Sequence, residues 1–441
     1  MSTGPFLAED QRRMLLGLRS ALYDGNTGLY AFPYHFDELQ RMVEFRSTLG
    51  VVYLEIFDFD RIEWLCGWQS FDEILKGMAE TLTAERGSAY PSCGLAASVG
   101  VHGGAFLLFL AENFAGSETT LADLETVSCA LVRKVHAAVC HQIPEELAPQ
   151  VEISAGCAIL RCEPMFRIER LIYRAIAEAR DGAVRSAHRD EQKRGAELRQ
   201  IIQAGLVETY FQPIVHVGSG DVFGYEALTR GPRGTLFETP KVMFGFSDRM
   251  RLSPMLDSLC RRRALAAARG MPAGQKLFVN SLPATLSDPR FADSEADAAA
   301  WQGLPAASDV VLEITERTGI EDFESFGKRL ERIRARGFQV AIDDVGTGYS
   351  SLQTISEVRP EFLKIDHSLV KNIHESLIKQ EIVSSILQLG GRIGSRVIAE
   401  GIEAEEEHEM IRAFGVELGQ GFLFGAPGPR PLRSGAASPG H

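Results

Sequence analysis

Eight short segments rich in β-branched and aromatic residues recur through the second half of the chain, and stretches long enough for a helix separate most of them. The segments are TYFQPIV, VFGYEAL, KLFVNS, VVLEIT, QVAIDD, FLKID, RVIAE and GQGFLF. Strands that alternate with helices in this way are typical of a (β/α)8 barrel. We therefore expect an α/β protein with a TIM-like barrel over residues 204–428.

The first 185 residues follow a different pattern. Strand-like runs at Val51–Phe59, Leu95–Leu110 and Val151–Leu160 lie among segments with helical periodicity. This mixture favours an α+β sandwich over 1–185, in which helices cover a mainly antiparallel sheet. Residues 186–203 are charged and helix-prone, and we expect a helical linker that acts either as a solvated spacer or as a signal-transmitting element. The Pro/Gly/Ser-rich tail, 429–441, is expected to be disordered.

The charge balance and the cysteines restrict partners and location. Lys and Arg number 46 against 59 Asp and Glu, a net charge of −13, which argues against binding of polymeric nucleic acid. The seven Cys include no CxxC pair, a pattern that suits a reducing compartment. No apolar stretch resembles a signal peptide or a membrane span. We expect a cytoplasmic protein that does not bind a membrane.

Polar residues stand at or near the ends of the predicted barrel strands. They are Glu226, Asn280, Glu313, Asp343, Asp344, Lys364, Glu400 and Gln420. In such barrels the functional groups lie at the C-terminal ends of the strands. Five carboxylates at one rim cannot all be ionised without a cation, because like charges a few ångströms apart repel strongly. The ligands are oxygens with no clustered His or Cys, which favours Mg²⁺ or Mn²⁺ over Zn²⁺.

The Asp343–Asp344 pair is the most informative part of this set. Adjacent strand residues point to opposite faces, so both carboxylates reach one site only where the strand ends and bends. Gly346 and Gly348 are expected to supply that bend. A carboxylate shared by two ions, together with its neighbour, suits a two-metal centre. Taken alone, each acid is more commonly an ion-pair or loop residue, and only the recurrence at successive strands favours a ligand role.

These residues belong to a series of segments that resembles the EAL-domain cyclic di-GMP phosphodiesterases. The segments are YFQPIV, YEALTRGP, FVNS, LEITER, IDDVGTGYSSL, FLKID, VIAEGIE and GQGFLFGAP. The resemblance implies hydrolysis of cyclic di-GMP to linear pGpG with two Mg²⁺ or Mn²⁺ ions per active site. It implies the metal ligands Glu226, Asn280, Glu313, Asp343, Asp344 and Glu400. Val345 departs from the family, which has Phe in this loop, and this change removes no ligand.

The same resemblance implies roles for six further residues. Lys364 would position or deprotonate the attacking water. Glu316 would hold the loop after Asp344, and Glu403 would complete the site, although both acids could equally orient neighbouring groups or be plain loop residues. The implied substrate-binding residues are Gln212, Arg230 and Gln420.

The first half resembles a diguanylate cyclase (GGDEF) domain that has lost its catalytic residues. The resemblance rests on DGNTGLYAFPYHFDEL, LEIFDFDRIEWLCG, VHGGAFLLFL and EISAGCAIL. HGGAF stands at the signature turn without either of its acids, and only Asp58 or Asp60 could match a metal ligand of that family. A nucleotidyl-cyclase-like domain without these acids is expected to make no cyclic di-GMP and to serve in dimerisation and regulation.

Two other functions remain open from the sequence. One is a receptor that binds cyclic di-GMP without cleaving it and signals through protein–protein contacts. The other is an interaction scaffold that binds no nucleotide. The enzyme is favoured because no acid of the expected set, nor the Lys, is missing. Homodimerisation through the barrel is expected from the resemblance, and a regulatory protein partner is left open.

Overall fold

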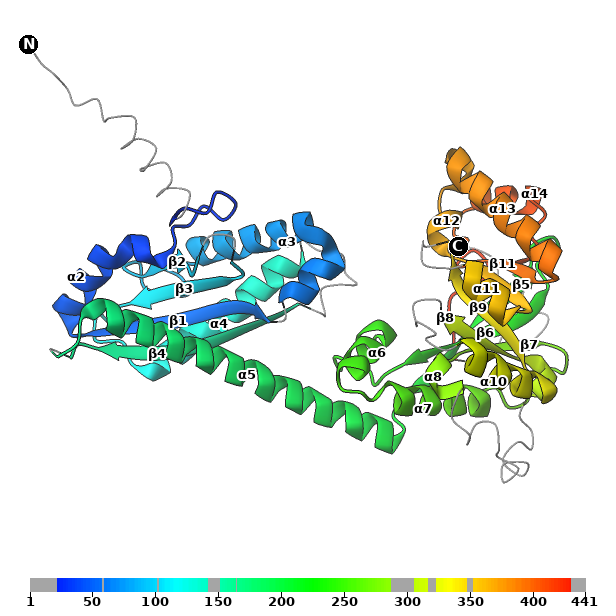
Figure 1. Ribbon diagram of the computed structural model, residues 1–441, viewed down its shortest axis with the longest axis horizontal. Coiled ribbons are helices and arrows are strands. Elements are labelled where there is room, and N and C mark those ends of the chain that lie inside the picture. The colour runs from blue at the N-terminus through cyan, green and yellow to red at the C-terminus, as the bar shows by residue number, and fades with distance from the viewer. Residues whose placement is uncertain are drawn as a thin grey trace, which may run out of the picture. The chain divides into compact units, whose positions relative to one another are not determined.

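The computed structural model describes residues 22–57, 59–100, 103–141, 151–163, 165–286, 305–315, 323–346 and 352–429. The chain divides into two compact units, Met1–Ala196 and Glu197–His441 (Figure 1). Helix α5, Ile168–Ala204, contains the point of division and also the predicted linker. Within the described part of the chain, no helix combines the length and the hydropathy needed to cross a membrane.

The first unit is built on a four-stranded antiparallel sheet of order β2-β3-β1-β4. Its strands are β1 (Thr48–Phe57), β2 (Leu95–Ser98), β3 (Ala105–Leu110) and β4 (Glu152–Arg161). Its helices are η1 (Phe32–His35), α2 (Phe36–Arg46), α3 (Phe59–Ala84), α4 (Leu121–Cys140) and the first part of α5. The predicted α+β sandwich is confirmed.

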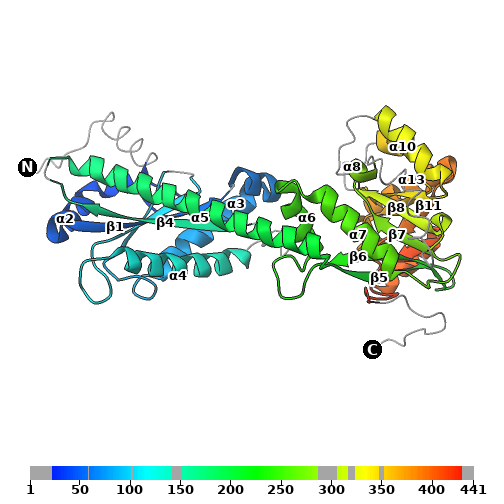
Figure 2. The same ribbon diagram turned by 90° about the horizontal axis from the view of Figure 1, so that it is seen from below.

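Alternation along β1 explains why helices cover both faces of this sheet. Val52 and Leu54 point into a core shared with α3 and α4, whereas Val51 and Tyr53 point into a second core shared with α2 and α5. Successive strand residues face opposite sides, so an uninterrupted apolar strand needs cover on both. Figure 2 shows α5 lying along one face of the sheet.

The second unit is a closed barrel of order β10-β11-β12-β5-β6-β7-β8-β9. Its strands are β5 (Glu208–His216), β6 (Val222–Arg230), β7 (Lys276–Asn280), β8 (Val310–Thr315), β9 (Gln339–Val345), β10 (Phe362–Ile365), β11 (Arg396–Ala399) and β12 (Leu418–Gln420). Its helices are α6 (Pro240–Arg249), α7 (Ser253–Ala267), α8 (Pro283–Leu286), η4 (Ala307–Asp309), α10 (Phe323–Ala335), α11 (Leu352–Val358), α12 (His367–Val370), η5 (Ile373–Glu375), α13 (Leu377–Ile393) and α14 (Glu405–Ala413). The predicted TIM-like barrel is confirmed.

One strand departs from an ideal (β/α)8 barrel. β5 runs antiparallel to both of its neighbours, β6 and β12, and the other neighbouring pairs are parallel. Only residues 217–221 separate β5 from β6, and a parallel crossover needs a dozen or more residues. A hairpin is therefore the connection that this spacing allows.

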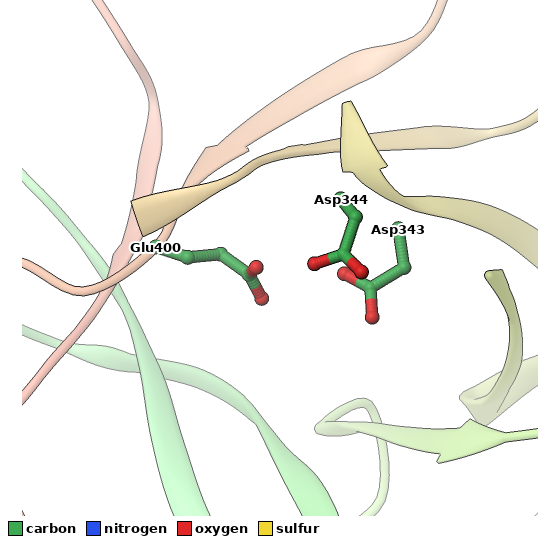
Figure 3. A group of neighbouring side chains, drawn as sticks. All are labelled: Asp343, Asp344 and Glu400. Carbon is green, nitrogen blue, oxygen red and sulfur yellow. The ribbon is translucent and has the colours of Figure 1, made fainter. Parts of the chain in front are cut away.

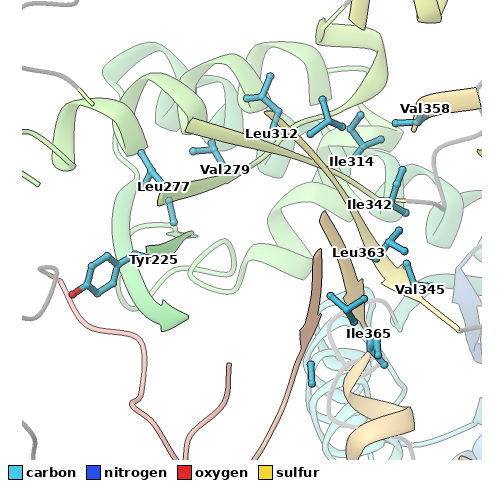
Figure 4. Packing of buried hydrophobic residues seen from close by; sticks show 14 of the residues in the cluster. Tyr225, Leu277, Val279, Leu312, Ile314, Ile342, Val345, Val358, Leu363 and Ile365 are labelled. Carbon is cyan, nitrogen blue, oxygen red and sulfur yellow. The ribbon is translucent and has the colours of Figure 1, made fainter. Parts of the chain in front are cut away.

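Two apolar layers hold the barrel together. Between strands and helices lies a large cluster that includes Leu277, Leu312 and Ile342, part of which Figure 4 shows. Inside the barrel lies a smaller plug, to which seven of the eight strands contribute one fully or almost fully buried residue each: Ile214, Phe278, Val311, Ala341, Phe362, Ile398 and Leu418. This plug forms the floor on which the polar site described next is built.

Candidate active site

A layer of polar side chains lies directly beyond the apolar plug. On five strands, and directly after β11, a polar residue follows the plug residue by two positions, as Asn280 follows Phe278 and Lys364 follows Phe362. The other four pairs are Val311/Glu313, Ala341/Asp343, Ile398/Glu400 and Leu418/Gln420. A spacing of two keeps both side chains on the inner face, and the polar member lies nearer the C-terminal end. On the antiparallel β5 the order is reversed, so that Gln212 precedes Ile214.

Lys364 is the centre of this layer. Its side chain is 1% exposed, and its Nζ lies 2.6 Å from Glu400 Oε1 and 2.7 Å from Glu313 Oε1. Asp343 Oδ1 lies at 3.2 Å and Glu226 Oε2 at 3.4 Å. Burial alone would lower the pKa of this amine, but the four surrounding carboxylates outweigh burial and raise the pKa well above its ordinary value. In this arrangement Lys364 is protonated.

One ammonium group does not balance the acids around it. Glu226, Glu313, Asp343, Asp344 and Glu400 would carry five negative charges against one positive charge, a net −4 with all of them ionised. Burial, followed by repulsion from Glu226, raises the pKa of Glu313 well above normal. Burial likewise raises the pKa of Glu400, although Lys364 opposes the rise. The layer therefore favours the arrival of further positive charge.

Several buried oxygens in the layer also lack hydrogen bonds. Among the described residues, neither carboxylate oxygen of Glu313 has a hydrogen-bond partner, nor does Oδ1 of Asp343 or Oε1 of Gln420. Lys364 Nζ forms ion pairs with two of these atoms, Glu313 Oε1 at 2.7 Å and Asp343 Oδ1 at 3.2 Å. Because a buried acceptor without a partner is costly, these oxygens fit the role of ligands to a hard cation such as Mg²⁺ or Mn²⁺.

Asp343, Asp344 and Glu400 form the most compact group of acids. One oxygen from each lies within 4.8 Å of the other two, and the three carboxylates converge on one region (Figure 3). Asp344 has the left-handed backbone angle φ 58°. At the same point the register of β9 against β10 shifts, since Leu363 pairs with Ile342 but Ile365 pairs with Val345. This bulge allows two consecutive side chains to reach one site.

The bend therefore begins two residues earlier than the sequence suggested. Glycine was expected to supply it, and Gly346 does have φ 110°, but the first left-handed residue is Asp344 itself. Asp tolerates this conformation better than most non-glycine residues. Gly348 lies outside the described residues.

Two side-chain amides hold Glu226. Gln420 Nε2 donates to Glu226 Oε2 at 2.7 Å and to Gln212 Oε1 at 3.0 Å, and Asn280 Nδ2 donates to Glu226 Oε1 at 3.1 Å. Burial would raise the pKa of Glu226, but Lys364 and these amide donors outweigh burial and lower it. Glu226 is thus an ionised acid with a fixed orientation, and it brings Gln212, Asn280 and Gln420 into the site.

The remaining predicted residues make other contacts or lie outside the described part. Arg230 ends β6, where its Nη1 donates to Thr229 O at 3.2 Å and its guanidinium lies 6.0 Å from the centroid of the Tyr210 ring. The side chain of Glu403 is exposed, and its backbone N–H donates to Glu407 Oε2 at 2.9 Å. Glu316 lies outside the described residues, as does Asp58.

A cavity of about 350 Å³ adjoins this site and was not foreseen. It lies among β6, β7, α6 and α7, and its lining includes Pro240, Phe244, Asp257, Cys260 and Asn280. Because Asn280 belongs both to this lining and to the polar layer, the cavity and the acids are neighbours. The volume is within the range of small-molecule pockets.

Asp257, in the wall of the cavity, takes part in a buried hydrogen-bond network. It is 3% exposed, and its Oδ2 accepts from Arg261 Nη1 at 2.6 Å and from Thr285 Oγ1 at 2.5 Å. Its Oδ1 accepts from the N–H of Leu282 at 3.0 Å, which fixes the turn after Asn280. The sequence signal was present, since an Asp and an Arg four residues apart stand among the apolar residues of one helix.

A comparison with known protein families identifies the second unit. The model of the EAL domain matches residues 196–427, which include the barrel and the whole polar layer. The chain belongs to the EAL domain family. Residues 226–228 read Glu-Ala-Leu, so Glu226, held by Gln420 and Asn280, opens that triplet in the EAL barrel.

The chain is also similar to individual curated proteins. The chain is 31% identical over 261 residues to an uncharacterised signalling protein of Caulobacter vibrioides. This match covers 59% of this chain and 32% of the relative. It is 28% identical over 431 residues to the cyclic di-GMP phosphodiesterase NbdA of Pseudomonas aeruginosa. This match covers 93% of this chain and 53% of NbdA. The chain therefore spans about a third to about half of the length of these two curated relatives.

A solved structure also resembles part of this chain. The EAL enzyme Bd1971, in its cAMP- and cyclic-di-GMP-bound form, is 26% identical with a TM-score of 0.50. The match covers 63% of this chain and 79% of that chain.

Proposed function

We propose that the EAL barrel hydrolyses cyclic di-GMP to linear pGpG with two Mg²⁺ or Mn²⁺ ions. The observation that carries this proposal is the layer of five buried or half-buried acids at one end of the barrel, four of which lie within ion-pair distance of Lys364 Nζ. Two divalent cations would bring four positive charges, which offsets the net −4 of the layer when every acid is ionised and Lys364 is protonated. The ligands would be Glu226, Asn280, Glu313, Asp343, Asp344 and Glu400.

Bound ions would supply Lewis acidity, lowering the pKa of a water and stabilising charge on a phosphodiester oxygen. The chain's own residues then perform the remaining tasks. Lys364 Nζ holds the attacking water and takes its proton, a role open to this amine once the charge of its four acids is compensated, because burial alone lowers its pKa. Arg230 offers two parallel donors to a phosphate.

The substrate's other parts fit the surroundings of the acids. Gln212 and Gln420, joined by a 3.0 Å hydrogen bond, would orient the ribose–phosphate ring over the polar layer. The cavity beside Asn280, with Pro240 and Phe244 in its wall, would receive a flat base. Glu316 and Glu403 are proposed to order the loops at the mouth of the barrel.

The decisive experiment is incubation of the purified full chain with cyclic di-GMP and Mn²⁺, followed by chromatography for pGpG. We expect pGpG as the product. Calorimetry with cyclic di-GMP in Ca²⁺ separates the alternatives, since a non-catalytic receptor shows binding heat without product and a scaffold shows neither. Absence of pGpG after a long incubation would reject the proposal.

For the first unit we propose a regulatory and dimerising role without cyclase activity. Incubation of the full chain with GTP and Mg²⁺ is expected to yield no cyclic di-GMP, and any formation of it would contradict this role. Light scattering is expected to report a homodimer, and a monomer at every concentration would argue against one.

The six described cysteines are free thiols, which supports the proposal of a cytoplasmic location.

A further inference from the structure

A buried carboxylate at the start of α14 connects two loops at the mouth of the barrel. Glu407 is 3% exposed. Its Oε1 accepts from the backbone N–H of Asn372 at 2.9 Å. Its Oε2 accepts from the N–H of Glu403 at 2.9 Å and from the N–H of Ala404 at 3.1 Å. Three backbone donors therefore converge on one side chain.

These donors lie downstream of two of the central residues of the site. Asn372 follows β10, which carries Lys364, and Glu403 follows β11, after which Glu400 comes directly. The two strands are neighbours in the barrel, and Lys364 Nζ lies 2.6 Å from Glu400 Oε1. Glu407 thus ties together the segments that leave the strands of this ion pair.

The other side of the Glu400 loop is held by close packing. A Cβ on Gly401, which has φ 68°, would lie 2.4 Å from the Cβ of His367. The N–H of Ile402 donates to the backbone oxygen of Gln420 at 3.0 Å, and a Cβ on Gly421 would lie 2.0 Å from Ile402 O. One end of the loop, at Gly401 and Ile402, is thus held by packing. The other end, at Glu403 and Ala404, is held by its hydrogen bonds to Glu407.

The first turn of α14 depends on the same carboxylate. The residue before the helix is Ala404, which has no side-chain acceptor for the free N–H groups of a helix start. Burial works against ionisation of Glu407, but its three backbone donors outweigh burial and keep its pKa below the ordinary value. An ionised acid near a helix N-terminus is also favoured by the helix dipole.

We propose that Glu407 is a positioning residue for the reaction, because it fixes the loops after β10 and β11 and so holds Glu400 and Lys364 in the geometry that binds the metal ions. This inference rests on the proposed function. It also gives Glu403 a role through its backbone, because the N–H of Glu403 donates to the Glu407 carboxylate. The exposed side chain of Glu403 is not needed for that contact.

The test compares Glu407→Gln and Glu407→Ala with the unchanged full chain. Mn²⁺ affinity by calorimetry is the first measurement, and kcat and KM with cyclic di-GMP are the second. Positioning partners of metal ligands change affinity or activity by about 10–100-fold. We expect Glu407→Ala to weaken Mn²⁺ binding and lower kcat within that range with little change in KM. Glu407→Gln keeps one acceptor oxygen, and we expect this variant to retain part of the Mn²⁺ affinity and part of kcat.

Ser395→Ala is the matched control. Ser395 is also buried, at 8% exposure, and its Oγ donates to Pro360 O at 2.5 Å. It therefore connects the segments before β10 and β11, at the opposite end of the strands. Its loss is expected to lower the melting temperature and to leave Mn²⁺ affinity unchanged.

The outcomes separate this inference from the proposed function. Glu407 variants with lowered melting temperatures but normal Mn²⁺ affinity and kcat would overturn the positioning role, and the milder Gln variant keeps this result accessible if the Ala variant does not fold. If the unchanged chain binds Mn²⁺ but makes no pGpG, the proposed function fails. Weaker Mn²⁺ binding by the variants would still support the positioning role in that case.

Discussion

Asp344 occupies a backbone conformation that is unfavourable for most residues with a side chain, with φ 58°. Such a conformation costs of order 1–2 kcal/mol, and strain of this kind concentrates at functional sites. Here it aims the Asp344 carboxylate at the region that Asp343 and Glu400 share. The strained residue is thus the structural reason that two adjacent acids serve one site.

Replacing Asp343 by Asn is expected to abolish turnover and preserve the fold. The amide has the shape of the carboxylate but lacks the charge that a divalent cation needs, so we expect at least about a 100-fold loss of pGpG formation. Chromatography measures the rate, and circular dichroism checks the fold. A near-normal rate in this variant would remove Asp343 from the metal site.

Divalent cations are expected to stabilise the chain. With all of its acids ionised the layer would carry a net −4, so a bound cation would relieve repulsion in the native state, and a ligand at 100 times its Kd adds about 2.7 kcal/mol per site. Thermal melts should therefore rise with Mn²⁺ and fall with EDTA. In the Asp343→Asn variant the rise should be smaller. Identical melts of the unchanged chain in Mn²⁺ and EDTA would contradict a cation site in the layer.

At the scale of single elements, the end of β9 is closely packed. Gly346 has φ 110°, and a Cβ placed on it would lie 2.2 Å from Leu369 Cδ1. The missing side chain at Gly346 therefore allows the backbone at the end of β9 to pack closely against Leu369 of α12.

Gly346→Ala is expected to lower both stability and turnover. The added methyl group meets Leu369 and the backbone angle disfavours a Cβ, so we expect about 1–3 kcal/mol of destabilisation and a displaced Asp344. Gly391→Ala in α13 is the control, since a Cβ there meets nothing within 4 Å and a helix gains about 0.5–1 kcal/mol from the change. Denaturant melts and pGpG rates distinguish the two, and equal behaviour would refute the account of β9.

At the scale of the whole molecule, α5 contributes to the cores of both units. Ile172 and Ala183 belong to the core between α5 and the sheet of the first unit. Leu198, Ile201 and Ile202 belong to a second cluster that includes Met243 and Leu256. These last two residues lie on α6 and α7, the helices that also form walls of the cavity beside the site.

Leu198→Ala is therefore expected to destabilise the second unit. The side chain is fully buried, and such truncations cost about 2–5 kcal/mol. Calorimetry should show a lower transition for the EAL barrel and an unchanged one for the first unit. Gly156→Ala should do the reverse, because a Cβ there would lie 2.0 Å from the backbone oxygen of Ala179 on α5. A single transition shifted equally by both changes would show that the units do not unfold separately.

Much of the barrel could be predicted because its signals are local. A polar residue two positions after an apolar one, as in Val311 and Glu313, places both on the inner face of a strand wherever that strand lies. The recurrence of polar residues at the ends of successive apolar segments was sufficient to predict that several acids meet at one rim of the barrel. The hairpin between β5 and β6 was less evident. The antiparallel direction of β5 depends on the short connection to β6 rather than on the pattern of residues in the strand.

The local order of residues thus determined which side chains face inward and which chemistry they carry. Only the closed barrel decided that Lys364 meets four acids at once, since distances between strand ends depend on how eight strands close. The same holds at the mouth of the barrel, where the sequence singled out Glu403 and the fold buries Glu407 instead. Burial of a helical side chain is decided by what packs against it, and no short stretch of sequence contains that information.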